Sequence, residues 1–156
     1  MNNLVKTLAI AAFAAAGAFG VTTAQASASN FNVSFAVQNN DASNNMIVSG
    51  TIPSTVTGLS TSAISPGANN PASGHATYSD LLPIGLAKSV SLTFQAQNGG
   101  GACTFTLAVS KDNNPLGAYL LHFSSDAPSR CTAPADVHSS TGQFTSQTYI
   151  LSWKSA

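Results

Sequence analysis

The sequence predicts an all-β fold, a single antiparallel β-sandwich of about seven strands in an immunoglobulin-like or Greek-key arrangement. Short segments with apolar residues at every second position recur along the chain after residue 30. Most of them end at clusters of Gly, Pro, Asn or Asp, which favour turns. No segment after residue 26 has the apolar period of about 3.6 residues that a helix needs. A closed barrel is the alternative fold for the same pattern.

Residues 1–26 have the features of a cleavable signal peptide, which we expect to be helical. Lys6 provides the positive charge, an apolar stretch follows it, and Ala24-Gln25-Ala26 fits the pattern that signal peptidase recognises. The mature domain is therefore expected to span residues 27–156, or to begin at Ser29. The apolar stretch is shorter than the roughly 20 residues of a membrane span. We expect export by the secretory route, to the periplasm, the outer surface or the medium, without stable membrane insertion after cleavage.

The first half of the mature chain predicts two clear strands and a long loop. Residues 31–38 alternate in the manner of a half-buried strand, and residues 45–52 form a second β candidate that ends at a proline. Residues 53–76 are rich in Pro, Gly, Ser and Asn and predict an irregular loop with one short strand within 56–64. Residues 77–82 are expected to form a further short strand. The inward side of the first strand would carry Phe31, Val33, Phe35 and Val37.

Residues 88–109 predict a β-hairpin. Apolar residues alternate with Ser, Thr and Gln on both sides of the turn Asn98-Gly99-Gly100-Gly101, whose residues tolerate positive φ. Asp112-Asn113-Asn114-Pro115 predicts the next turn, and residues 117–124 return as a third strand. That strand would place Leu120 and His122 on the side opposite to Tyr119, Leu121 and Phe123.

The C-terminal part predicts a loop followed by a closing strand. Residues 125–142 contain two prolines and a cysteine and are expected to be irregular. Residues 144–154 alternate again, which predicts a strand. One of its faces would carry Tyr149, Leu151 and Trp153, and the opposite face Phe144 and Ile150.

Cys103 and Cys131 are the two cysteines of the chain. In an exported protein, two thiols are expected to form one structural disulfide. Their spacing is unlike the Cys-x-x-Cys pattern of a redox centre. Such a bond would clamp the loop at residues 125–142 onto the edge of the predicted sheet.

The low charge of the chain excludes several classes of partner. Charged residues make up 6% of the sequence, and the formal net charge is +0, whereas about 25% of a typical domain is charged. Nucleic-acid binding needs clustered Lys and Arg, and so does electrostatic docking on anionic lipid. We therefore expect no nucleic-acid partner. A neutral surface rich in Ser, Thr and Asn also favours self-association.

The sequence contains no convincing catalytic or metal-binding motif. Asp136 and His138 would share one face of an extended segment and could ligate one metal, but the sequence does not show that His75 or His122 converges on them, so the signal is weak. The chain lacks a Gly-x-Ser-x-Gly elbow, and its acidic residues are scattered Asp residues with no Glu. We therefore predict a protein that is not an enzyme and that has no cofactor and no bound metal.

Four aromatic residues give the sequence a candidate ligand platform. Aromatic faces beside Asn and Gln suit neutral sugar rings, which agrees with the low charge. The competing interpretation is that these side chains form part of the core, because they occur at alternating positions in predicted strands. The four residues are Tyr78, Tyr119, Tyr149 and Trp153.

The opening Phe31-Asn-Val-Ser-Phe-Ala-Val37, the closing Tyr149-Ile-Leu-Ser-Trp-Lys154 and the Ala-rich leader carry two resemblances. The chain resembles small exported antigens of Burkholderia-type bacteria, which have no assigned activity. Its opening strand is also similar to that of chaperone–usher pilins and spore-coat-U-like proteins, which implies a polymerising surface subunit. In that case an unpaired edge at residues 31–38 would accept or donate a strand.

These observations together predict an exported, non-enzymatic β domain of the bacterial cell envelope. Its partner would be a protein or a glycan at the cell surface. The alternatives are a polymerising pilin-like subunit, for which self-association is expected, and a carbohydrate-binding module.

Overall fold

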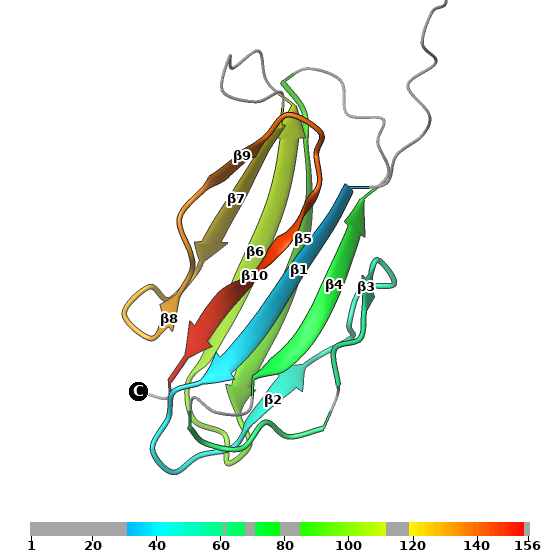
Figure 1. Ribbon diagram of the computed structural model, residues 1–156. Coiled ribbons are helices and arrows are strands. Elements are labelled where there is room, and N and C mark those ends of the chain that lie inside the picture. Colours follow the sequence, from blue (N-terminus) through cyan, green and yellow to red (C-terminus); the bar gives the residue numbers. More distant parts are fainter. Residues whose placement is uncertain (1–30, 61, 68–70, 79–84, 112–118, 155–156) are drawn as a thin grey trace, which may run out of the picture.

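β-strands form the regular structure of the chain (Figure 1). The computed structural model describes residues 31–60, 62–67, 71–78, 85–111 and 119–154. The described residues form strands and loops and contain no helix, so none of their segments is a helix that could span a membrane. The all-β prediction is confirmed. The predicted signal peptide at residues 1–26 and the predicted turn at residues 112–115 lie outside the described ranges.

Five strands form the first sheet, called sheet A. The long central strand β1 pairs antiparallel with β4 and parallel with β10, so one pair departs from the predicted antiparallel arrangement. β1 is therefore not an edge strand, and the expectation of an unpaired edge at residues 31–38 is wrong. In spatial order, the strands are β3 (Val56–Thr57), β4 (Ala72–Tyr78), β1 (Phe31–Asn39), β10 (Phe144–Trp153) and β8 (Cys131–Thr132).

The second sheet, called sheet B, is antiparallel throughout its described pairs. Its centre is the predicted hairpin of β5 and β6, to which β7 adds as the predicted third strand. Gly99 in the turn has a φ of 83°, as expected for a glycine-rich connection. The spatial order is β2 (Met46–Ser49), β5 (Ala87–Ala96), β6 (Ala102–Lys111), β7 (Tyr119–Ser125) and β9 (Val137–Ser139).

The core lies between the two sheets, which form two layers in Figure 1. Alternation places every second side chain of the long strands on the inner face, as the sequence predicted. The predicted inward residues of β1 are fully buried. Rings from both sheets meet there, and Phe31 of β1 lies 4.6 Å from Tyr119 of β7 between ring centroids. The largest fully buried side chains include Trp153, Phe31, Phe35, Phe94, Phe105 and Phe144.

Strand β4 corrects the predicted boundary between loop and strand. Residues 72–76 were expected to be loop, but they pair with β1 along its length. Small residues are required here because Phe35 packs directly on Gly74. A Cβ atom at Gly74 would lie 2.7 Å from the ring of Phe35, which is too close for any other residue without rearrangement.

Two further expectations about the C-terminal part are corrected. The loop at residues 125–142 contains the short strands β8 and β9. Phe144 was expected on the face opposite to Tyr149, but both side chains are buried. The cause is a register shift, because Val33 pairs with Phe144 and Phe35 pairs with Tyr149. The exposed residues between them, 145–148, form a bulge. After this bulge, the side chain of Tyr149 points inward, as that of Phe144 does.

The chain crosses from sheet A to sheet B directly after β1, and buried polar residues hold this crossing. The Asn39 amide group donates to the carbonyl oxygens of Asn44 and Ile64, at 2.8 and 2.9 Å, and accepts from the backbone N–H of Asp41. The Asp41 carboxylate accepts from two backbone N–H groups further along the turn. Asn39 thereby fixes where β1 ends and where β2 begins.

Candidate functional site

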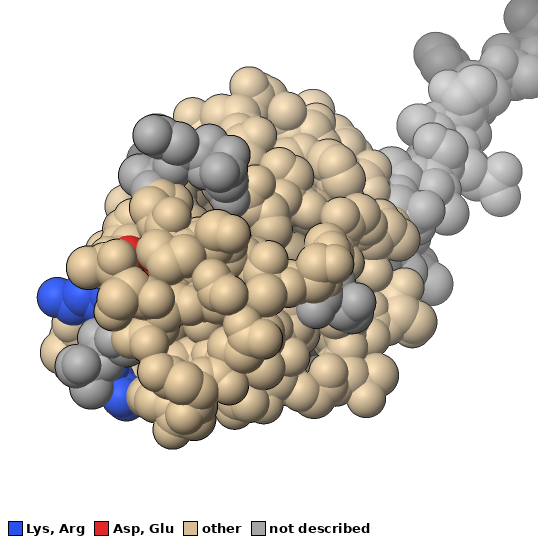
Figure 2. Space-filling view, turned by 90° about the horizontal axis from the view of Figure 1, so that it is seen from below, with Lys and Arg blue, Asp and Glu red and all other residues tan. Residues whose placement is uncertain are grey.

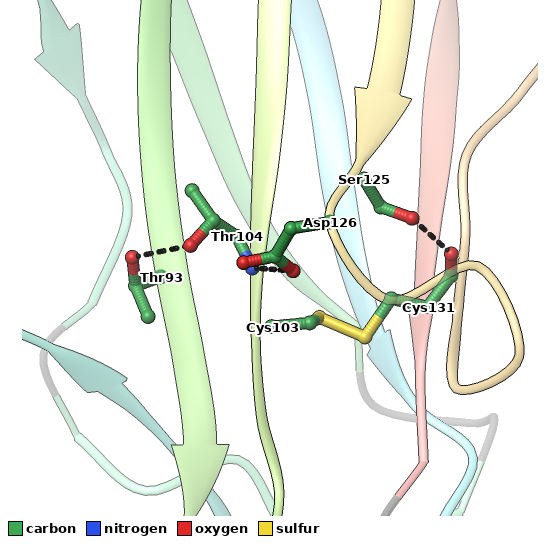
Figure 3. The surroundings of a disulfide bond; sticks show 6 residues. All are labelled: Thr93, Cys103, Thr104, Ser125, Asp126 and Cys131. Atoms are coloured by element: carbon green, nitrogen blue, oxygen red, sulfur yellow. Dashed lines mark hydrogen bonds between the residues drawn. A yellow bond between two sulfur atoms is a disulfide. The ribbon is translucent and has the colours of Figure 1, made fainter.

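The predicted disulfide is present and links the two sheets. Cys103 lies on β6 of sheet B and Cys131 on β8 of sheet A, with a Cα–Cα distance of 6.5 Å (Figure 3). Both residues are buried. The bond therefore does more than clamp a loop to a sheet edge, because it cross-links the layers of the domain.

Hydrogen bonds around the disulfide hold the loop between β7 and β8 (Figure 3). The Ser125 hydroxyl donates to the carbonyl oxygen of Cys131 at 2.7 Å. The Asp126 carboxylate accepts from the backbone N–H of Thr104 at 2.8 Å. These groups satisfy backbone atoms where the regular ladders end. Their arrangement is that of a structural cross-link.

The four residues of the predicted aromatic platform do not form an exposed surface. Tyr78, Tyr149 and Trp153 are 4%, 4% and 1% exposed and belong to the core. Tyr119, the first residue of β7, is partly buried against Phe31. The platform prediction is therefore corrected. The alternating positions that suggested a shared face indicate the inner face of the sandwich.

The Tyr78 hydroxyl donates a hydrogen bond to the carbonyl oxygen of Leu107 at 2.9 Å, from sheet A to sheet B. Because burial disfavours the charged phenolate, it raises the pKa of Tyr78 far above its ordinary value. The native state therefore keeps the proton that the unfolded chain releases near pH 10. The stability that results is complete below about pH 10 and is lost as the pH rises further.

We predict that Tyr78→Phe reduces the decrease in the free energy of unfolding that occurs above about pH 10. At neutral pH the same variant loses about 1 kcal/mol, because the hydrogen bond between the Tyr78 hydroxyl and the carbonyl oxygen of Leu107 is lost. Urea unfolding at several pH values between 7 and 11 measures both effects. An unchanged dependence on pH above 10 in the variant would show that Tyr78 is not the group responsible.

The structure places each histidine on an outer face. His75 of β4 lies opposite Ser34 of β1, and its Nδ1 is 3.2 Å from the serine hydroxyl. His122 of β7 is hydrogen-bonded to Asp136, with 2.7 Å between Nδ1 and Oδ1. His138 lies opposite Leu120.

These polar pairs come from strands distant in the sequence, so spacing alone could not reveal them. Asp136 and His138 are both exposed, in agreement with the predicted shared face. Within the described ranges, however, no three His, Cys, Asp or Glu residues come together in a way that could hold a metal ion. The pair of His122 and Asp136 fastens the segment before β9 to β7.

The outer side of sheet B carries an ordered set of polar side chains. Because side chains alternate along a strand, every second one points away from the core. On this outer side, hydroxyl groups of neighbouring strands lie opposite one another. Ser91 and Thr106 are hydrogen-bonded at 3.0 Å, as are Thr93 and Thr104. We call this surface the hydroxyl face, and define it by Ser89, Ser91, Thr93, Thr104, Thr106 and Ser124.

Few charged groups lie beside the hydroxyl face, and they include the Asp126 carboxylate, which accepts from the N–H of Thr104, and Asp136 beside His122. Figure 2 shows the lower end of the molecule, where the Lys, Arg and Asp residues in view lie at one side. Hydroxyl groups donate and accept hydrogen bonds at once, so such a surface can bind neutral polar groups. The polar positions of residues 88–109 were visible in the sequence, but their pairing across strands depends on the register.

Comparisons with protein-family models, with curated proteins and with solved structures found no match to this chain.

Proposed function

We propose that this chain is an exported, non-enzymatic β domain of the bacterial cell envelope that binds a neutral partner through the hydroxyl face. The observation that carries the proposal is the set of cross-strand hydroxyl pairs on the outer side of β5 and β6. The partner expected on this surface is a glycan or a protein segment that presents hydroxyl or amide groups.

Two features support the export part of the proposal. The cross-link between Cys103 and Cys131 suits an oxidising compartment, because thiols in the cytosol are kept reduced. The leader at residues 1–26 has the composition of a signal peptide. The two-sheet arrangement agrees with the predicted sandwich, of which the immunoglobulin-like or Greek-key form remains our prediction.

The hydroxyl face is also suited to binding by its rigidity. Hydroxyl pairs that are already oriented lose little conformational freedom when a partner binds. The strands beneath them are the longest of sheet B and are fixed by Leu92, Phe94 and Phe105 on the inner side. A long, flexible charged side chain would lose more freedom in the same position.

Binding of the purified mature domain to isolated envelopes of the producing bacterium tests the proposal. We expect saturable binding that Thr106→Lys weakens about tenfold, because a charge is introduced on a neutral contact surface. Ser73→Lys is the matched control, since Ser73 is exposed on the outer side of sheet A. We expect this control to bind as the wild type does.

Pretreatment of the envelopes separates the two classes of partner. Loss of binding after protease treatment indicates a protein, and loss after periodate oxidation indicates a glycan. Non-saturable binding, or equal weakening by Thr106→Lys and Ser73→Lys, would refute the use of the hydroxyl face.

A further inference from the structure

Among the described residues, β2 covers only part of the outer edge of strand β5. β2 pairs with Thr93, Phe94, Gln95 and Ala96 of β5. In the part of the chain that the structure describes, no strand pairs with residues 87–92 on that side. An open edge of this length presents backbone donors and acceptors to an incoming strand.

The hydrogen bonds between β2 and β5 show which backbone N–H and C=O groups of β5 point to this edge. The Gln97 N–H donates to the carbonyl oxygen of Asn45, towards the β2 side. Because the groups of successive residues alternate between the two sides of an antiparallel strand, those of Ser91, Ser89 and Ala87 also point to the β2 side. Beyond the end of β2, these three residues form the open edge.

This edge is self-complementary. We propose that two copies of the chain associate through β5, antiparallel, about a twofold axis at Ser89. In that register Ser89 pairs with Ser89 of the second copy, and Ala87 pairs with Ser91. All three residues of each edge then find partners, in roughly six hydrogen bonds. Their side chains are small and extend the hydroxyl face across the axis.

The number of edge residues that find a partner selects this register. A twofold axis at Lys88 would pair Ala87 with Ser89 but would leave Ser91 opposite Gly85, whose N–H is already bonded to the carbonyl oxygen of Lys111. The axis at Ser89 instead places Lys88 opposite Val90. It also places the exposed Leu86 at the interface, next to the end of β2 of the second copy, where Leu92 itself is buried in the core. Leu86 is 58% exposed and is one of the two exposed large hydrophobic residues in the described ranges.

Structural features at both ends of the open edge limit the length of the pairing between the two copies. Ser49 of β2 pairs with Thr93, so a second copy cannot continue along the edge beyond that position. Gly85, whose φ is 82°, precedes Leu86 and donates its N–H to the carbonyl oxygen of Lys111 on β6, so it is not a partner for the second copy. The two edges therefore fit as closed twofold partners, and the contact generates a dimer rather than an open fibre.

Disulfide trapping of the mature, oxidised chain tests the register. We expect Ser89→Cys to form a covalent dimer under mild oxidation at least roughly ten times faster than Ser91→Cys, because residues on the axis face each other at disulfide distance. Ser124→Cys on β7 is the matched control from the same face, and we expect it to react as slowly. Equal rates at the three positions would overturn the proposed register.

Sedimentation velocity of the chain without added cysteines tests the association itself. We expect a monomer–dimer equilibrium that Ser89→Pro abolishes, because proline removes an N–H that points away from β6 and leaves that ladder intact. Ser91→Lys serves as a second variant in case the proline prevents folding. A wild-type monomer at concentrations up to about 1 mM, or an undiminished dimer in both folded variants, would overturn the proposal. Neither result alters the envelope-binding test of the hydroxyl face.

Discussion

Removal of the cross-link between the sheets is expected to lower the free energy of unfolding by about 3.6 kcal/mol. The expectation follows from the sequence separation of 28 residues between Cys103 and Cys131, whose link restricts the unfolded chain. The double variant Cys103→Ala/Cys131→Ala is the appropriate change. It leaves no reactive thiol and places small apolar side chains at two buried positions.

Denaturant unfolding of this double variant measures the effect, with the wild type under reducing conditions as a second route to the same state. Both are expected to unfold at a lower midpoint. β8, which has two residues and pairs only with the end of β10, is expected to lose protection from hydrogen exchange first. A change below about 1 kcal/mol would show that packing alone holds the layers together.

Asn39→Ala is expected to cost about 3 kcal/mol, the second largest effect. The substitution removes the hydrogen bonds of Asn39 to the carbonyl oxygens of Asn44 and Ile64 and to the backbone N–H of Asp41, and of these groups the Ile64 carbonyl oxygen keeps the N–H of Met46. Asn39 is fully buried, so water cannot replace these hydrogen bonds without opening the crossing. The strand ends next to it would loosen together.

The matched control for this prediction is Asn45→Ala. Asn45 lies in the same connection, but its amide donates to Gln97 at an exposed position. We expect the control to change the free energy of unfolding by less than about 0.5 kcal/mol. Equal effects of the two variants would contradict the role assigned to Asn39.

Predictions from the sequence succeeded where the contacts that determine a strand lie close together in the sequence, and failed where those contacts are distant. The hairpin of β5 and β6 was predictable because its turn and its alternation lie within one segment. The first residues of β4 were missed because Ser73, Gly74 and His75 have low or unremarkable β-propensity, and only pairing with β1 makes them a strand. Phe144 was placed on the wrong face because a bulge in β10 interrupts the period.

The candidate site was predictable only in part for the same reason. The disulfide followed from the cysteine count and the expected compartment. The buried position of Tyr149 and Trp153 follows from the sandwich as a whole, since an alternating strand does not reveal which of its faces is covered. The pairs Ser91 with Thr106 and Thr93 with Thr104 needed the register between strands, which alternation does not specify.

Mass spectrometry of the protein isolated from its natural source, digested without reduction, tests the central claim most directly. The account of an exported, cross-linked two-sheet domain predicts a joined peptide that contains Cys103 and Cys131, no free thiol, and a mature N-terminus at Ser27 or Ser29. A chain that retains Met1 and carries two free thiols would contradict the account.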